Sequence, residues 1–196
     1  IVTFDEVQPR LKERKISPAN IENGLLLFVA GLVYKVMLAN QIAALWNDVM
    51  VAGVMGINTA TAWLGAWGYS MQIYFDFLGY SLMAIGMGYM LGFRFPKNFS
   101  NPYCAVSVTD FWRRWHITLG RWFREYVYIP LGGNKKGQFR LVINTFIVWF
   151  LTGLWHGAAW NFIIWGMFFF ILMMLEKFIY LRFLEKHPII GHLYML

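Results

Sequence analysis

Two histidines stand where the surrounding sequence favours an apolar residue. His156 lies in LTGLWHGAAW (151–160), between two tryptophans and beside a run of small residues, and His116 lies in DFWRRWHITLGRWF (110–123). An imidazole has an ordinary pKa of about 6.5, so at neutral pH it can take a proton from a hydroxyl. No cysteine or serine stands at a recognisable spacing for a covalent relay. His156 is therefore predicted to act alone, as a base that activates a hydroxyl for direct attack on an activated acyl group.

Structural roles for the same residues remain open. Small residues such as Gly153 and Gly157 most often allow membrane helices to pack closely. A histidine in an apolar stripe is often held by a structural hydrogen bond, and a plain interfacial anchor would also explain the segment around His116. An ionisable group inside a membrane segment is costly, however, and this favours a functional role for His156.

The composition predicts an all-α, polytopic integral membrane protein. The 196 residues are 59% hydrophobic and 14% charged, whereas soluble domains carry about 25% charged residues. Segment 59–93 contains one charge, Asp76, and segment 141–175 contains none. A third segment, 24–46, is interrupted by Lys35 and either spans the membrane or lies partly in its interface.

The longest apolar segments exceed the thickness of a bilayer. As one helix, 141–175 would extend about 52 Å, against the ~30 Å of hydrocarbon that it has to cross. Basic residues flank both of its ends, so we expect a hairpin with both ends inside and His156 near the outer tip. If segment 59–93 is also a hairpin, Asp76 lies near its outer tip. Its carboxylate would then orient the imidazole, line an acceptor path or make a structural hydrogen bond.

A basic loop separates these segments. Between residues 94 and 140, two acids, Asp110 and Glu125, oppose nine basic residues: Arg94, Lys97, Arg113, Arg114, Arg121, Arg124, Lys135, Lys136 and Arg140. The positive-inside rule places this loop in the cytoplasm, facing anionic lipid headgroups rather than nucleic acid. Ser107 and Asp110 have the spacing of a capping box, and the residues after them predict an amphipathic interfacial or re-entrant helix with His116 on its apolar face.

Three blocks of the sequence resemble a known family. IYFDFLGYSLMAIGMGYMLGFRFPKNFSNPY, DFWRRWHITLGRWFREYVYIPLGGNKKG and LTGLWHGAAWNFIIWG are similar to the core of the membrane-bound O-acyltransferases, in particular the bacterial alginate O-acetyltransferase branch. Residues 1–196 would then be the central fragment of a single domain of this family. Its parts would be membrane helices over 59–93, a cytoplasmic basic loop with an amphipathic helix over 94–140, and a membrane hairpin over 141–176.

The resemblance implies a multi-pass enzyme of the bacterial cytoplasmic membrane with no bound cofactor and no metal. His156 matches the catalytic histidine of the family, and His116 matches its second characteristic polar position, on the cytoplasmic side. An acyl group, acetyl in the alginate branch, would pass from a cytoplasmic thioester, acetyl-CoA or an acyl carrier protein, through a tunnel to a hydroxyl of an extracytoplasmic polysaccharide. Expected partners are the bilayer, that polysaccharide, and periplasmic or extracellular acyltransferase proteins, with no nucleic acid.

Within this scheme the two histidines are expected to work at different depths. His116 would serve the donor side, and His156, some spans deeper, would carry the chemistry. The candidates for the donor side are Arg113, Arg114 and Trp115, and the candidates for the substrate path are Asp76, Trp155 and Asn161.

One departure from the alginate pattern leaves the substrates open. Leu78 and Leu82 stand where that branch usually has Ser and a second Asp, and leucine at the latter position resembles the D-alanyl transferases of teichoic acid. The block YIPLGGNKKG is typical of the alginate branch instead. D-alanyl transfer from a carrier protein to teichoic acid, and a non-enzymatic transporter or scaffold, are therefore the alternatives.

Overall fold

A computed structural model describes residues 1–135 and 137–195, and over these residues the chain is all-helical, with no strand. Lys136, counted above with the basic loop, lies outside the described residues. The chain divides into two compact units, Val2–Lys97 and Asn98–Leu196, the second also taking in Ile1. Each unit is described by itself.

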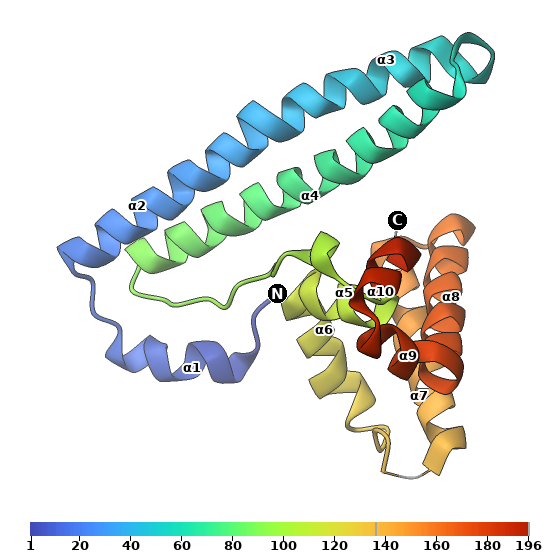
Figure 1. Ribbon diagram of the computed structural model, residues 1–196. Helices are drawn as coiled ribbons and strands as arrows, with labels where there is room; N and C mark the ends of the chain where they lie inside the picture. Colours follow the sequence, from blue (N-terminus) through green and yellow to red (C-terminus); the bar gives the residue numbers. More distant parts are fainter. Residues whose placement is uncertain (136, 196) are drawn as a thin grey trace. The chain divides into compact units, whose positions relative to one another are not determined.

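The first unit is built around a long antiparallel hairpin (Figure 1). After α1 (Phe4–Glu13), one arm runs through α2 (Pro18–Val33), the π-helical turn η1 (Tyr34–Ala39) and α3 (Asn40–Gly56). The other arm is α4 (Thr59–Met90). The side chain of Ser17 caps α2 by accepting from the backbone N–H of Asn20, and Asn58 caps α4 through Thr61. The arms approach closely, because a Cβ on Gly79 would lie 2.6 Å from the carbonyl oxygen of Gly31.

Segment 59–93 is not a hairpin in itself, so the prediction that Asp76 lies near an outer tip is wrong. α4 runs unbroken for 32 residues, and Asp76 lies near its middle, where it forms an ion pair with Lys35 of η1. The length of the segment showed that a helix over it would be longer than a bilayer is thick, but it did not show which segment this helix packs against. Its partner is the other arm, residues 18–56.

Three helices of the described chain are long and apolar enough to cross a membrane: Pro18–Gly53, Gly137–His156 and Trp160–Lys186. The first contains segment 24–46 and the other two form the predicted hairpin. α4 is not among them.

The second unit contains that hairpin, α7 (Gly137–His156) and α8 (Trp160–Leu175), joined by a three-residue turn at 157–159 (Figure 1). The turn directly follows His156, as the predicted hairpin requires. Short elements surround the hairpin: η2 (Pro102–Cys104), α5 (Val108–Arg114), α6 (Ile117–Phe123), η3 (Arg124–Tyr128), η4 (Glu176–Tyr180), α9 (Leu181–Lys186) and α10 (Pro188–Met195).

The predicted single helix over 110–123 is two helices. Ser107 caps α5 through the backbone N–H of Asp110, as expected, but the helix stops at Arg114 and a new one starts at Ile117. Between them His116 takes a left-handed conformation, with φ 45° and ψ 51°. The apolar periodicity continues across the break, which is why the sequence pattern did not show it.

Candidate active site

The break between α5 and α6 fixes the position of His116. A non-glycine residue in the left-handed region costs about 1–2 kcal/mol, and His116 is the N-cap of α6 without capping it through its own side chain. Asn98 supplies the cap. Its main-chain oxygen accepts from the N–H of Ile117 at 2.9 Å, and its Oδ1 accepts from the N–H of Thr118 at 3.3 Å. The first donors of α6 are thereby satisfied from a distant segment.

The imidazole of His116 is buried, with 7% of the residue exposed. Its Nδ1 lies 3.0 Å from Oδ1 of Asn98. Burial lowers the pKa of His116 to about 4, so the ring is neutral at pH 7.

His156 is the last residue of α7 and is more exposed than His116. Its ring packs against Trp155 and Trp165, with centroid distances of 5.0 and 4.9 Å. The ring of Trp155 also meets that of His116, at 6.0 Å between centroids. One indole therefore contacts the imidazoles of both histidines.

Both histidines line one cavity of about 690 Å³. The expectation that His156 lies some spans deeper than His116 is therefore wrong. The helix break accounts for the difference, because it places His116 against Trp155 of α7 instead of on the apolar face of an interfacial helix.

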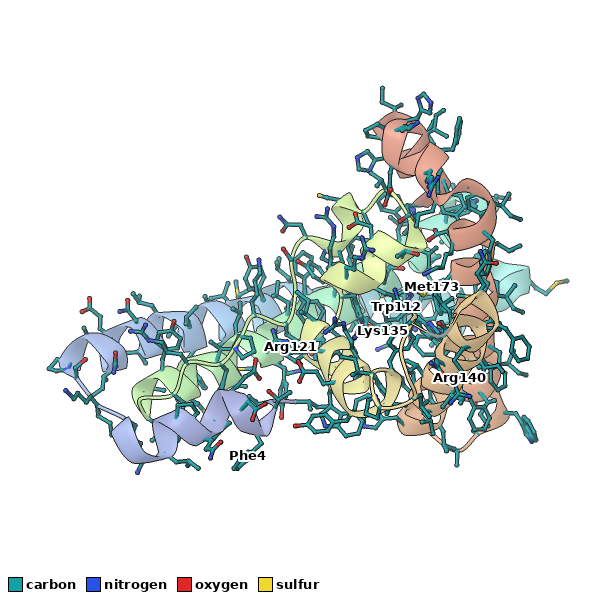
Figure 2. All side chains as sticks on the ribbon, turned by 90° about the horizontal axis from the view of Figure 1, so that it is seen from below. Phe4, Trp112, Arg121, Lys135, Arg140 and Met173 are labelled. Carbon is teal, nitrogen blue, oxygen red and sulfur yellow. The ribbon has the colours of Figure 1, made fainter. Side chains whose placement is uncertain are left out.

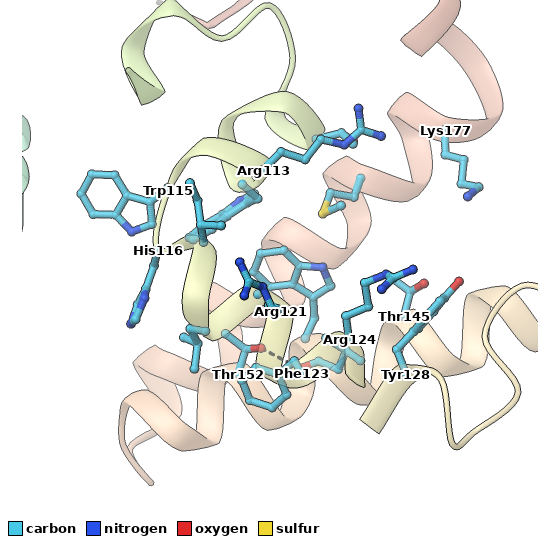
Figure 3. A pocket seen from close by; sticks show the side chains of 18 of the residues that line it. Arg113, Trp115, His116, Arg121, Phe123, Arg124, Tyr128, Thr145, Thr152 and Lys177 are labelled. Carbon is cyan, nitrogen blue, oxygen red and sulfur yellow. Dashed lines mark hydrogen bonds between the residues drawn. The ribbon is translucent and has the colours of Figure 1, made fainter. Parts of the chain in front are cut away.

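The rest of the cavity wall is mainly aromatic, apolar and basic, with three threonines, Thr109, Thr145 and Thr152. Trp112 of α5 and Met173 of α8 both line it and are labelled in Figure 2. Four cations contribute to the wall and none of its described residues is an acid: the cations are Arg113, Arg121, Arg124 and Lys177. Figure 3 shows His116 on one side of the cavity and Arg124, Tyr128 and Lys177 on the other. The cavity thus joins an imidazole-bearing end to a cationic end, which suits an anionic ligand that carries a reactive group.

Comparison with known proteins identifies the family. The profile of the membrane-bound O-acyltransferase family matches residues 1–188. The chain belongs to this family. It is 42% identical over 177 residues to a probable alginate O-acetylase of Pseudomonas putida, which covers 90% of this chain and 36% of that protein. It is 41% identical over 180 residues to a peptidoglycan O-acetyltransferase of Helicobacter pylori, covering 90% of this chain and 34% of the relative.

A third relative represents the D-alanyl branch. The teichoic acid D-alanyltransferase of Bacillus subtilis is 37% identical over 119 residues, which are 57% of this chain and 30% of that protein. The chain thus spans about a third of the length of these relatives.

The three predicted donor-side residues do not all lie on the cavity. Arg113 and Trp115 line the cavity with His116. Arg114 is not part of the lining, and its Nε lies 3.0 Å from Oδ2 of Asp110.

The predicted substrate-path residues also differ in their positions. Trp155 is 52% exposed and lies between the two histidine rings, and Asn161 is exposed on the first turn of α8. Neither belongs to the cavity lining. Asp76 belongs to the first unit, where Lys35 is its partner.

Two residues that hold the site together were missed by the sequence analysis. Asn98 contacts His116 from 18 positions away, and no local spacing indicates this contact. Glu176 is fully buried and accepts from the N–H of Thr109 at 2.8 Å and from its Oγ1 at 2.6 Å, as well as from the N–H of Val108. This carboxylate satisfies the N-terminus of α5. The sequence signal for Glu176 was its position as a single acid directly after the long apolar segment 141–175.

Proposed function

We propose that the full-length protein is a membrane O-acyltransferase. It moves an acetyl group from a cytoplasmic thioester donor to hydroxyls of an extracytoplasmic polysaccharide. The observation that carries this proposal is the presence of His116 and His156 on one cavity whose charged wall residues are all basic. In this proposal it is a multi-pass protein of the bacterial cytoplasmic membrane, with the cationic end of the cavity facing the cytoplasm and a periplasmic or extracellular acyltransferase partner that receives or presents the polymer.

The proposed reaction needs one base and no covalent enzyme intermediate. His156 takes the proton from the acceptor hydroxyl while the oxygen of that hydroxyl attacks the thioester carbonyl. The new C–O bond forms, the C–S bond breaks, and the departing thiolate takes up the proton that His156 accepted, which returns His156 to its neutral form. Imidazole suits this step, since it is a base near neutral pH.

The cationic wall of the cavity is proposed to hold the donor. Acetyl-CoA and a phosphopantetheinyl carrier protein both carry phosphate at the opposite end of the pantetheine arm from the thioester, and guanidinium groups bind phosphate well. Arg121, Arg124 and Lys177 join Arg113 and Trp115 in this role. Arg114 is left out, because Asp110 neutralises it.

The acceptor is proposed to approach from the turn between α7 and α8. Trp155 and Asn161 flank that turn. Asp76 is left out of this path, because its carboxylate is paired with Lys35.

D-alanyl transfer is the second candidate function. Leu82 favours it, since leucine at this position resembles the teichoic acid enzymes. Acetyl transfer has the broader support, with 42% identity over 90% of the chain to an alginate O-acetylase against 37% over 57% to a D-alanyltransferase.

Substitution of His156 tests the proposal. In the full-length protein, His156→Ala should lower polymer O-acetylation by roughly 10²- to 10⁴-fold, the usual contribution of a general base. The measurements are ester acetate on the isolated polymer and protein amount in the membrane. His192→Ala is the matched control, because His192 is exposed and is not part of the cavity lining. Normal acetylation by His156→Ala would contradict the assignment, and loss of the protein itself would favour a packing role.

A further inference from the structure

The amide orientation of Asn98 is determined by its neighbours. The oxygen and nitrogen of an amide look alike, but a backbone N–H can only donate. The N–H of Thr118 lies 3.3 Å from the atom assigned as Oδ1, and the hydroxyl of Thr118 lies 3.0 Å from the same atom. The atom that meets this N–H must be the carbonyl oxygen.

The same oxygen determines which nitrogen of His116 carries the proton. Oδ1 of Asn98 has no hydrogen to give, so the contact of 3.0 Å to the ring requires a proton on Nδ1. A neutral imidazole has one N–H, and its other nitrogen is then a pure acceptor. Burial keeps this ring neutral at pH 7, with a pKa of about 4. Nε2 of His116 therefore holds the lone pair.

The contact is held in place from both sides of the helix break. Besides capping α6, the segment that contains Asn98 reaches the end of α5, where the N–H of Ser100 donates to the carbonyl oxygen of Arg114 at 3.0 Å. The backbone that turns His116 into the left-handed conformation and the oxygen that receives its Nδ1–H thus belong to one short stretch, 98–100.

We propose that Asn98 is a positioning residue that holds His116 as its Nδ1–H tautomer, so that Nε2 meets the cavity as a hydrogen-bond and proton acceptor. The catalytic role that this tautomer gives to His116 rests on the proposed function. An acceptor at Nε2 cannot stabilise the developing oxyanion of the thioester. It can receive a hydrogen bond from another hydroxyl of the acceptor sugar or a proton relayed during attack. His116 would then assist His156 on the hydroxyl side of the reaction and not on the carbonyl side.

Among the described residues of the cavity wall there is no acid that could accept a hydrogen bond from His116 in place of Asn98. The groups that share the cavity with it come from α5, α6, η3, α7 and η4, and they are Arg113, Arg121, Arg124, Tyr128, His156 and Lys177. These groups do not supply a carboxylate, and the contact from Nδ1 to the amide oxygen of Asn98 carries the assignment of the tautomer.

The ¹⁵N spectrum of the histidine rings tests the tautomer without any activity measurement. Full-length protein labelled with ¹⁵N-histidine is measured in lipid at pH 7, and the His116 signals are assigned by their loss in His116→Gln. We expect a protonated Nδ1 and an unprotonated Nε2. A protonated Nε2 in the wild-type protein would overturn the proposal, whatever the outcome of the His156→Ala experiment.

Two variants of Asn98 test its part in this arrangement. Asn98→Asp keeps the acceptor oxygen, so it should keep the Nδ1–H tautomer, retain activity, and raise the pKa of His116 by placing a carboxylate beside the ring. Asn98→Leu removes the acceptor, so it should shift the tautomer and lower kcat by roughly tenfold or more, with less effect on the KM for the donor. Asn134→Leu, on an exposed residue outside the cavity lining, is the control.

The outcomes separate a positioning role from a purely structural one. If Asn98→Leu fails to accumulate, Asn98→Asp still decides, because a carboxylate in contact with Nδ1 stabilises the protonated ring and moves the titration of His116 upward. An unchanged titration in Asn98→Asp, or an unchanged spectrum and rate in Asn98→Leu, would overturn the role of Asn98. An inactive His156→Ala together with these results would leave the proposed function standing.

Discussion

His116 combines a left-handed backbone with a buried imidazole, and both features depend on residues far away in the chain. Its pKa of about 4 in the folded protein lies below the 6.5 of an unfolded chain, because burial disfavours the charged ring. The unfolded state therefore binds more protons between these values. The contribution of His116 to the free energy of unfolding is complete above pH 6.5 and is lost as the pH falls towards 4.

This shift predicts a measurable acid sensitivity. Between pH 7 and pH 4 the wild-type protein should lose up to about 3 kcal/mol through this one group. Thermal or denaturant unfolding of the purified full-length protein at both pH values measures it. His116→Gln cannot titrate and should show a smaller difference between the two pH values, whereas His192→Gln, on an exposed site, should behave like wild type. The same pH dependence in wild type and His116→Gln would show that His116 does not titrate as described.

Single residues were predictable where the local sequence carries the signal. His156 and its aromatic neighbours stand out in an apolar segment, and the structure places His156 on the cavity. The division of the donor arginines was not predictable from spacing, because it depends on the hydrogen bond from Arg114 to Asp110 one helical turn away. The part played by Asn98 was not predictable either, since it arises only when the chain breaks at His116.

Helices were predictable where length and charge together determine the answer. The α7–α8 hairpin follows from an apolar segment too long for one span with basic residues at both ends, and the structure has it. Segment 59–93 has a similar length and was interpreted in the same way, but α4 is continuous and pairs with residues 18–56. The apolar periodicity also predicted one helix where the structure has α5 and α6, because a single left-handed residue does not change the apolar pattern.

Two glycines determine how closely α7 and α8 approach. A Cβ on Gly153 would lie 2.6 Å from the carbonyl oxygen of Phe162, and one on Gly166 would lie 2.6 Å from that of Trp149. Both oxygens belong to helix backbone and cannot move independently. The contact is reciprocal, since each glycine faces the backbone of the other helix, as is common for small residues in membrane helices.

Alanine at these positions should therefore destabilise the hairpin. Gly153→Ala gains about 1 kcal/mol of helix propensity but incurs an overpacking cost of about 1–3 kcal/mol, and the cost should dominate because the clash is with backbone. The measurement is the melting temperature of the full-length protein in detergent. Gly68→Ala is the control, because its Cβ would meet only the side chains of Leu45 and Ile42, at 3.4 and 3.6 Å. If Gly153→Ala melts at or above the temperature of Gly68→Ala, the close approach of α7 and α8 is not needed for stability.

The basic charge of the chain serves two purposes in the proposed mechanism. The chain has a net charge of +7. Some of its cations line the cavity, whereas Lys135 precedes α7 and Arg140 belongs to its first turn; both are labelled in Figure 2. By the positive-inside rule the same charges that would bind a phosphate-bearing donor also orient the hairpin with its turn outward. The donor-binding cations and the two ends of the hairpin are thus predicted to lie on the same side of the bilayer.

This orientation can be measured with single cysteines. Cys104 is exposed and has to be replaced first, as Cys104→Ser. Gln138→Cys, near the start of α7, is preferable to a change at Gly137, whose φ of 86° strains any other residue. In that background Gln138→Cys should resist a membrane-impermeant maleimide in intact cells and react in inverted vesicles. Ala158→Cys, in the turn between α7 and α8, should show the reverse, because the hairpin carries it to the other face.

The pair of sites makes the result decisive. Labelling of both cysteines from the same side would contradict a membrane-spanning hairpin, and labelling of Gln138→Cys in intact cells would reverse its orientation. Either result would remove the physical basis for transfer from a cytoplasmic thioester to an outer hydroxyl, because the cationic end of the cavity would no longer face the compartment that supplies the donor. The opposite labelling of the two sites would place the donor-binding cations inside and the turn that follows His156 outside, as the proposed direction of transfer requires.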